Sequence, residues 1–80
     1  MTATQTTAEG YEIIATAMAG TSEIFITRQK NYGGTCNRYP MCYAVRITHI
    51  PGDYHYITWD TCNTETEARK SANRAWARYR

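Results

Sequence analysis

The chain has 80 residues, enough for one domain, and a domain of this size removes only about 60–65% of its unfolded surface from water. Its core must therefore be thin, which leaves little apolar material for a deep substrate pocket and argues against a metabolic enzyme. The net charge is +2 and is unevenly distributed, because the first 23 residues hold three glutamates and no lysine or arginine, whereas the segment from Thr64 onward holds five basic and two acidic residues.

The N-terminal stretch predicts a flexible leader over residues 1–8, ahead of a single domain over residues 9–80, because it is mostly threonine and alanine without periodicity. It has neither the basic region nor the apolar stretch of a signal peptide, and no run in the chain approaches the ~20 apolar residues that cross a bilayer. The three cysteines, Cys36, Cys42 and Cys62, are an odd number and lack the spacing of a secreted disulfide scaffold. We therefore expect a cytoplasmic protein with no membrane contact.

Two β-branched runs at residues 11–18 and 23–30 predict a first hairpin, with a turn around Gly20. A helix over residues 8–19 competes with the first strand. The two consecutive isoleucines of that run favour the strand, since β-branched side chains are restricted in a helix.

A glycine-containing stretch at residues 31–40 predicts a loop, because Gly33 and Gly34 allow unusual backbone angles and Pro40 stops strand pairing. Long ordered loops in small domains tend to carry function. This one contains three residues suited to a contact surface: Tyr32, Arg38 and Tyr39.

A second hairpin is predicted from strands at residues 41–50 and 55–60, which turn through Pro51, Gly52 and Asp53. The predicted cross-strand pairs are His49 with His55, Ile47 with Ile57, and Val45 with Trp59. This register makes one face apolar and leaves the other face wet, as is typical of antiparallel sheets. The residues predicted on the wet face are Arg46, Thr48, Tyr56 and Thr58.

Thr64 followed by Glu67 predicts a capping box that opens a helix running to the end of the chain. An apolar stripe suited to packing on the sheet consists of Ala68, Ala72, Ala75, Trp76 and Tyr79, with Trp76 as the main anchor. On the opposite side, Lys70, Arg74 and Arg78 recur at every fourth position; they either form a solvated helix surface or attract an acidic partner. The pattern as a whole predicts an α+β fold, a four-stranded antiparallel sheet with one C-terminal helix packed on one face.

Metal and acid–base chemistry have few candidate residues. A metal site needs about four ligands, and the candidates are Cys36, Cys42, Cys62, His49 and His55. No two cysteines stand at zinc-finger spacing, so we expect inert thiols and no metal or other cofactor. In a less favoured alternative, His49 and His55 act as acid and base in a small ribonuclease, with Arg46 holding a phosphate. Paired residues across a strand end are ordinary, and no catalytic pocket is evident.

Nucleic-acid binding is the main alternative to protein binding, because cations are mixed with rings on which bases can stack. The residues concerned are Arg28, Lys30, Tyr32, Arg38, Tyr39, Arg46 and Tyr56. The sequence pI of about 8.5 is low for a dedicated nucleic-acid domain, which places this reading second.

The segment YITWDTCNTETEARKSANRAWARYR, a strand leading into the TETEA helix opening, resembles the small phage-encoded anti-CRISPR proteins, especially inhibitors of type I systems. The resemblance implies a non-enzymatic inhibitor in the cytoplasm of a bacterial host. It further implies docking on a subunit of the interference complex, with the backbone subunit that lines the guide RNA favoured, so that target DNA is blocked.

The residues expected to bind an acidic surface of such a subunit follow from charge and expected exposure, because no family motif assigns them. The cations are Arg28, Lys30, Arg38 and Arg46, followed by Lys70 and Arg74. The tyrosines expected to add rigid contact area are Tyr32, Tyr39 and Tyr56.

Overall fold

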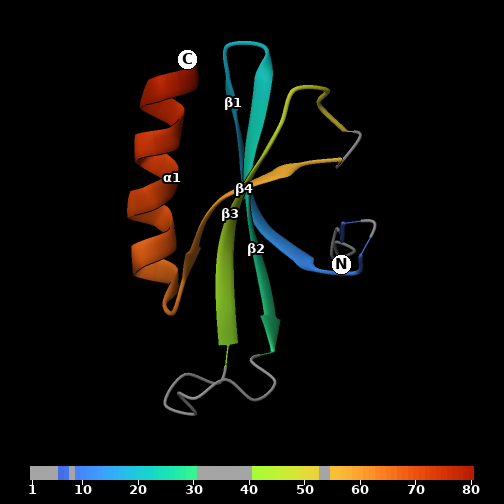
Figure 1. Ribbon diagram of the computed structural model, residues 1–80, viewed down its shortest axis with the longest axis vertical. Helices are drawn as coiled ribbons and strands as arrows, with labels where there is room; N and C mark the ends of the chain where they lie inside the picture. Colours follow the sequence, from blue (N-terminus) through green and yellow to red (C-terminus); the bar gives the residue numbers. More distant parts are fainter. Residues whose placement is uncertain (1–5, 8, 31–40, 53–54) are drawn as a thin grey trace, which may run out of the picture.

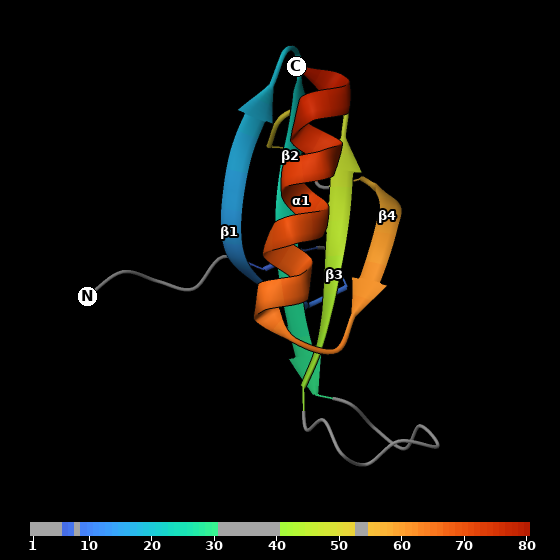
Figure 2. The same cartoon turned by 90° about the vertical axis from the view of Figure 1, so that its left-hand side faces the viewer.

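The structure is a computed structural model that describes residues 6–7, 9–30, 41–52 and 55–80. Its elements are β1 (Glu12–Ala19), β2 (Ser22–Lys30), β3 (Met41–Thr48), β4 (Ile57–Cys62) and α1 (Glu65–Tyr79). The strands form one antiparallel sheet in the order β1-β2-β3-β4, and α1 lies along one face of it (Figures 1 and 2). The predicted α+β fold is therefore confirmed. Among the described residues, no helix combines the length and apolar character needed to span a bilayer.

The first hairpin forms where the β-branched runs predicted it, and the competing helix over residues 8–19 does not occur. Its turn depends on Gly20, whose φ of 62° lies in the left-handed region that favours glycine. A β-carbon at Gly20 would lie 2.9 Å from the backbone oxygen of Tyr79 at the end of α1. The hairpin tip therefore packs directly against the C-terminal end of the helix.

The pairing of β3 with β4 contains a bulge that the sequence did not predict. Val45 lies opposite Asp60 and Arg46 lies opposite Thr58, so Trp59 is an extra residue on β4. The predicted pair of Val45 with Trp59 is therefore wrong. A bulge leaves one residue unpaired and bends its strand, and here β3 and β4 pair on both sides of it.

The end of the second hairpin is also shorter than predicted. Ile47 does pair with Ile57, as expected. However, β3 ends at Thr48 and β4 begins at Ile57, so the predicted pair of His49 with His55 is not part of the sheet.

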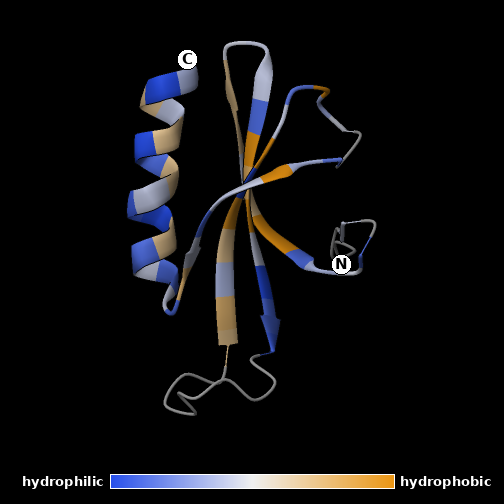
Figure 3. Cartoon of the chain, in the orientation of Figure 1, coloured by the Kyte–Doolittle hydropathy of each residue, from blue (hydrophilic) through white to orange (hydrophobic). Residues whose placement is uncertain are grey.

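The main core lies between the sheet and α1. Its buried members are Ala19, Ile24, Ile26, Val45, Ile47, Cys62, Ala68 and Ala75. The two helix alanines let α1 approach the sheet closely, while Ala72 and Tyr79 pack half-buried against the cluster. The prediction that Trp76 is the main anchor of the helix is wrong, because 39% of its surface is exposed at the border of α1 and β1. Figure 3 shows hydrophilic colours on the side of α1 that faces away from the sheet.

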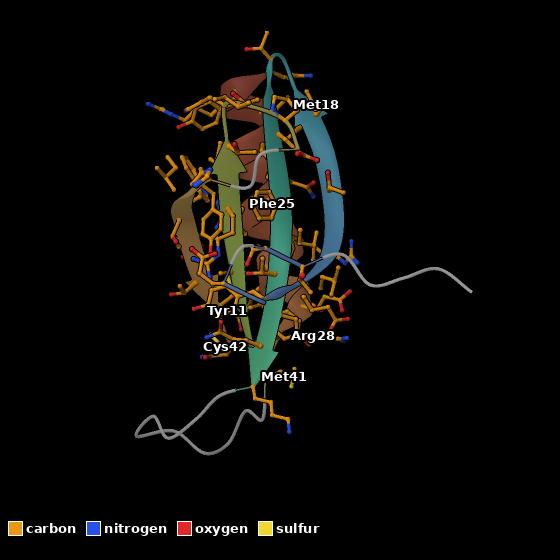
Figure 4. All side chains as sticks on the ribbon, turned by 90° about the vertical axis from the view of Figure 1, so that its right-hand side faces the viewer. Tyr11, Met18, Phe25, Arg28, Met41 and Cys42 are labelled. Carbon is orange, nitrogen blue, oxygen red and sulfur yellow. The ribbon has the colours of Figure 1, made fainter. Side chains whose placement is uncertain are left out.

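The opposite face of the sheet is not simply wet, which corrects the prediction for this face. Phe25 is fully buried there, and Thr27 and Thr48 are almost so. The first parts of β1 and β4 curl over this face on the side away from α1 (Figure 1), and Figure 4 shows Phe25 and Tyr11 on it. The ring of Tyr56 meets the ring of Phe25 edge-on, with centroids 5.5 Å apart. A second, smaller core therefore closes the centre of the face.

Candidate functional site

Arg46, a predicted partner-binding residue, is engaged within the molecule. Its guanidinium carbon lies 5.2 Å from the ring centroid of Tyr11 and 4.9 Å from that of Tyr56. The same group donates hydrogen bonds to the hydroxyls of Thr27 and Thr58. Cation–π contacts and hydrogen bonds of this kind hold a cation in place. Arg46 and Tyr56 therefore stabilise the second core. Their charged and aromatic groups are largely occupied by contacts within the chain and are little available to a partner.

The segment before β1 is tied to the same cluster. The hydroxyl of Tyr56 donates a 2.8 Å hydrogen bond to the carboxylate of Glu9, which lowers the pKa of Glu9. Burial, followed by this bond to Glu9, raises the pKa of Tyr56. Thr7, inside the predicted leader, is buried, and its amide donates to the carbonyl of Tyr11. Residues 1–5 and 8 of that leader lie outside the described residues.

The other cations predicted near the sheet differ in their surroundings. Arg28 forms a 2.7 Å ion pair with Glu12 on β1, and the hydrogen bond to Glu12 raises the pKa of Arg28. Lys30, at the end of β2, is exposed and has no carboxylate partner in the described part of the chain. The remaining predicted residues, Tyr32, Arg38 and Tyr39, lie outside the described residues.

The cationic helix face, which we define as Lys70, Arg74 and Arg78, is the largest group of cations without a carboxylate partner among the described residues. All three side chains are exposed on α1. No carboxylate of a described residue forms an ion pair with any of them, whereas Arg69 is paired with Glu65 at 2.8 Å. Spacing of four residues places the three on one side of the helix, and the side of α1 away from the sheet has hydrophilic colours in Figure 3.

His49 and Arg46 do not converge on one catalytic site. His49 lies on the α1 side of the sheet, where its Nδ1 is 2.8 Å from the hydroxyl of Ser22 and its ring centroid is 5.9 Å from that of Tyr79. The stacked guanidinium of Arg46 lies on the opposite face. A phosphate held by Arg46 would therefore be separated from His49 by the sheet.

A partly buried polar cluster joins β4 to α1, and sequence reasoning missed it. The hydroxyl of Ser71 donates a 2.7 Å hydrogen bond to Asp60, and the thiol of Cys62 lies 3.8 Å from the same carboxylate oxygen. Burial, and then the charge of Asp60, raises the pKa of Cys62 to about 11, so its thiol is protonated at neutral pH. Ser71 falls between Ala68 and Ala75 at helical spacing, a signal that could have placed it on the buried stripe.

Among the described residues, no group of three His, Cys, Asp or Glu side chains could hold a metal ion, and Cys42 and Cys62 are free thiols. Cys62 pairs with Tyr43, so Cys42, the residue before Tyr43 on β3, points to the other face of the sheet. Cys36 lies outside the described residues.

A shallow groove of about 410 Å³ runs between β1 and α1. It is lined by Ala15, Thr16, Ala17, Ile24, Ile26, Arg69, Ala72, Asn73 and Trp76. Along the groove β1 contributes the small side chains of Ala15 and Ala17, while α1 lies mainly over β2 and β3 (Figure 2). At one end it is closed by Trp76, whose indole Nε1 donates a 2.9 Å hydrogen bond to the carbonyl of Met18.

These features define a small sheet-and-helix domain whose described part has two open surfaces, the cationic helix face and the groove between β1 and α1. No protein-family model, curated protein or solved structure matches the chain. The function must therefore be inferred from the side chains that form these surfaces.

Proposed function

We propose that this chain is a non-enzymatic binding protein that docks the cationic helix face on an acidic surface of another protein. The proposal depends on one observation: some cations of the chain are engaged within the molecule, whereas those of the cationic helix face are not. Arg46 and Arg28 interact with tyrosine rings or a carboxylate of the same chain, whereas Lys70, Arg74 and Arg78 are exposed and lack carboxylate partners among the described residues.

The helix gives these charges a fixed geometry. α1 begins with a capping bond, in which the amide of Glu67 donates to the hydroxyl of Thr64 at 3.2 Å, and it is held to the sheet by its buried alanines and Ser71. Charges presented by a rigid element need little ordering when they meet a partner, and complementary fields accelerate encounter and select the partner.

The partner that we propose is a subunit of a type I CRISPR interference complex, with the backbone subunit favoured. Support comes from the resemblance of the β4–α1 segment to small phage-encoded anti-CRISPR proteins of similar size and strand order. On this proposal the protein acts in the cytoplasm of a bacterial host and blocks binding of target DNA. Its contribution is steric and electrostatic, and no cofactor takes part.

The test is retention of purified type I complex subunits by the immobilised protein, together with target-DNA binding by the complex. The double variant Lys70→Gln/Arg74→Gln removes two charges from the helix face. A matched control, Thr61→Glu/Asn63→Glu, changes the net charge equally at exposed positions away from that face. We expect the helix variant to bind about tenfold more weakly, as two interfacial ion pairs of ~0.7 kcal/mol each imply, and the control to bind nearly normally.

Three outcomes would reject this function. The first is that no subunit is retained and target-DNA binding is unchanged. The second is that the helix variant and the control behave alike, which would exclude the helix face as the contact. The third is tight, salt-sensitive binding of the protein to naked DNA or RNA, which would favour nucleic-acid binding.

A further inference from the structure

The groove between β1 and α1 lies beside an open strand edge. β1 is an outer strand of the sheet, and its outer side is occupied at two described points. Thr6 bridges to Glu12 near the start of the strand, and Trp76 caps the carbonyl of Met18 near its end. Between these points, no described residue pairs with the outer backbone of β1. An exposed strand edge of this kind is a template for pairing with another extended chain.

The side of β1 that faces the groove is suited to large side chains from such a chain. Ala15 and Ala17 are small, Ala17 is exposed, and Trp76 offers a partly exposed ring at the end of the groove. The volume of about 410 Å³ falls within the range of about 300–1,000 Å³ found for binding pockets. Alternate side chains of an added strand point to the same face, so every second residue would enter the groove.

Two polar groups on the helix wall determine what charge the occupant should carry. The ion pair of Arg69 with Glu65 uses Nε of the guanidinium, and no described residue bonds to either of its Nη groups. The exposed amide of Asn73 likewise has no hydrogen-bond partner among the described residues. A guanidinium with two available Nη groups matches a carboxylate, and the neighbouring Lys70 and Arg74 strengthen the preference for negative charge.

We propose that the groove binds an extended acidic segment of a partner protein, which pairs with the open edge of β1 as an additional strand. Apolar side chains at alternate positions of the segment lie on Ala15 and Ala17 against Trp76. A carboxylate of the segment meets the Nη groups of Arg69, and the amide of Asn73 bonds its backbone. This mode of recognition combines backbone pairing for affinity with a pocket for specificity. It does not depend on the partner proposed above.

The probe is a phage-displayed library of random dodecapeptides, selected on the immobilised full chain. We expect the enriched sequences to alternate apolar residues with others and to include Asp or Glu. A synthetic peptide with the enriched sequence is then titrated by fluorescence polarisation. Ala17→Tyr, which fills the groove, should weaken binding at least about tenfold, whereas Thr61→Tyr on the opposite edge strand should not. Arg69→Gln should cost about tenfold, the effect of one charge-assisted hydrogen bond.

A second measurement uses the unchanged protein, so it is independent of how the variants fold. Two peptides are compared, one with its backbone amides methylated at the odd positions and one at the even positions. Methylation should abolish binding of one peptide and leave binding of the other nearly unchanged, because only alternate amides face β1 in a paired strand. The proposal is overturned if no sequence is enriched, if Ala17→Tyr binds the peptide like the Thr61→Tyr control, or if the two methylated peptides bind equally. Lys70→Gln/Arg74→Gln should alter peptide binding less than Arg69→Gln, so failure of the helix-face function and failure of this site are distinguishable.

Discussion

Replacing Arg46 with methionine tests whether this cation belongs to the fold or to a binding surface. Arg46→Met keeps an unbranched apolar stem and removes the charge and all donors. It therefore eliminates the cation–π contacts to Tyr11 and Tyr56 and the hydrogen bonds to Thr27 and Thr58. The buried hydroxyl of Thr27 also loses a donor, which adds to the cost.

The magnitude follows from these four contacts. A cation–π contact at a partly exposed site contributes about 0.5–1 kcal/mol, and a hydrogen bond contributes about 0.5–1.5 kcal/mol net. Because the contacts share one side chain they are not additive. We therefore expect the free energy of unfolding to fall by about 2–3 kcal/mol, which lowers Tm by about 10–20 °C in a domain of this size.

The assay is urea denaturation and thermal unfolding followed by circular dichroism, with Arg74→Met as the matched control. Arg74 is exposed and has no carboxylate partner among the described residues, so its replacement should change stability by no more than about 0.5 kcal/mol. Equal stability of the two variants would refute the structural role of Arg46 and return it to the set of residues available for a partner.

Three further predictions concern the helix and its contacts. Gly20→Ala should lower Tm clearly more than Gly52→Ala, since both glycines have positive φ but only the first β-carbon would clash with the end of α1; thermal unfolding checks this. Thr64→Ala should cost about 1 kcal/mol in urea denaturation through loss of the N-cap, and Thr66→Ala little. Cys62 should resist iodoacetamide at pH 8 in the folded state, as mass spectrometry would show. Because folding raises the pKa of Cys62 to about 11, the stability that this thiol contributes should be lost as pH rises from about 9 to 11. Cys62→Ala should reduce the loss of stability over this range, to which Tyr56, whose pKa is also raised, still contributes.

Local patterns predicted the elements of this fold, whereas the contacts between distant segments escaped them. The capping pair of Thr64 and Glu67 was predictable because both partners lie within one turn. The bulge at Trp59 was not predictable from the sequence. One extra residue in β4 keeps the apolar and polar alternation on each side of the bulge but shifts the pairing register between the two sides. The two hairpins were therefore predicted correctly, but of the three predicted cross-strand pairs only Ile47 with Ile57 occurs in the sheet.

The same distinction explains the candidate site. Spacing of four residues predicted that Lys70 and Arg74 share a side of the helix, and the structure leaves them exposed there. Nothing in the spacing of Tyr11, Arg46 and Tyr56 indicates that the two rings enclose the guanidinium, since they come from three separate parts of the chain. The expected exposure of Arg46 and Tyr56 rested on strand alternation alone, which does not reveal what curls over the face.

The order of the strands in the sheet bears on how the chain folds. Each strand pairs with its neighbour along the chain, so every ladder can form from a hairpin at low loop-closure cost. The contact of Trp76 with Met18, in contrast, joins residues 58 positions apart. We infer that the helix docks late, after the hairpins have assembled. Gly20→Ala, which disturbs this docking, should then accelerate unfolding more than it slows refolding in stopped-flow measurements.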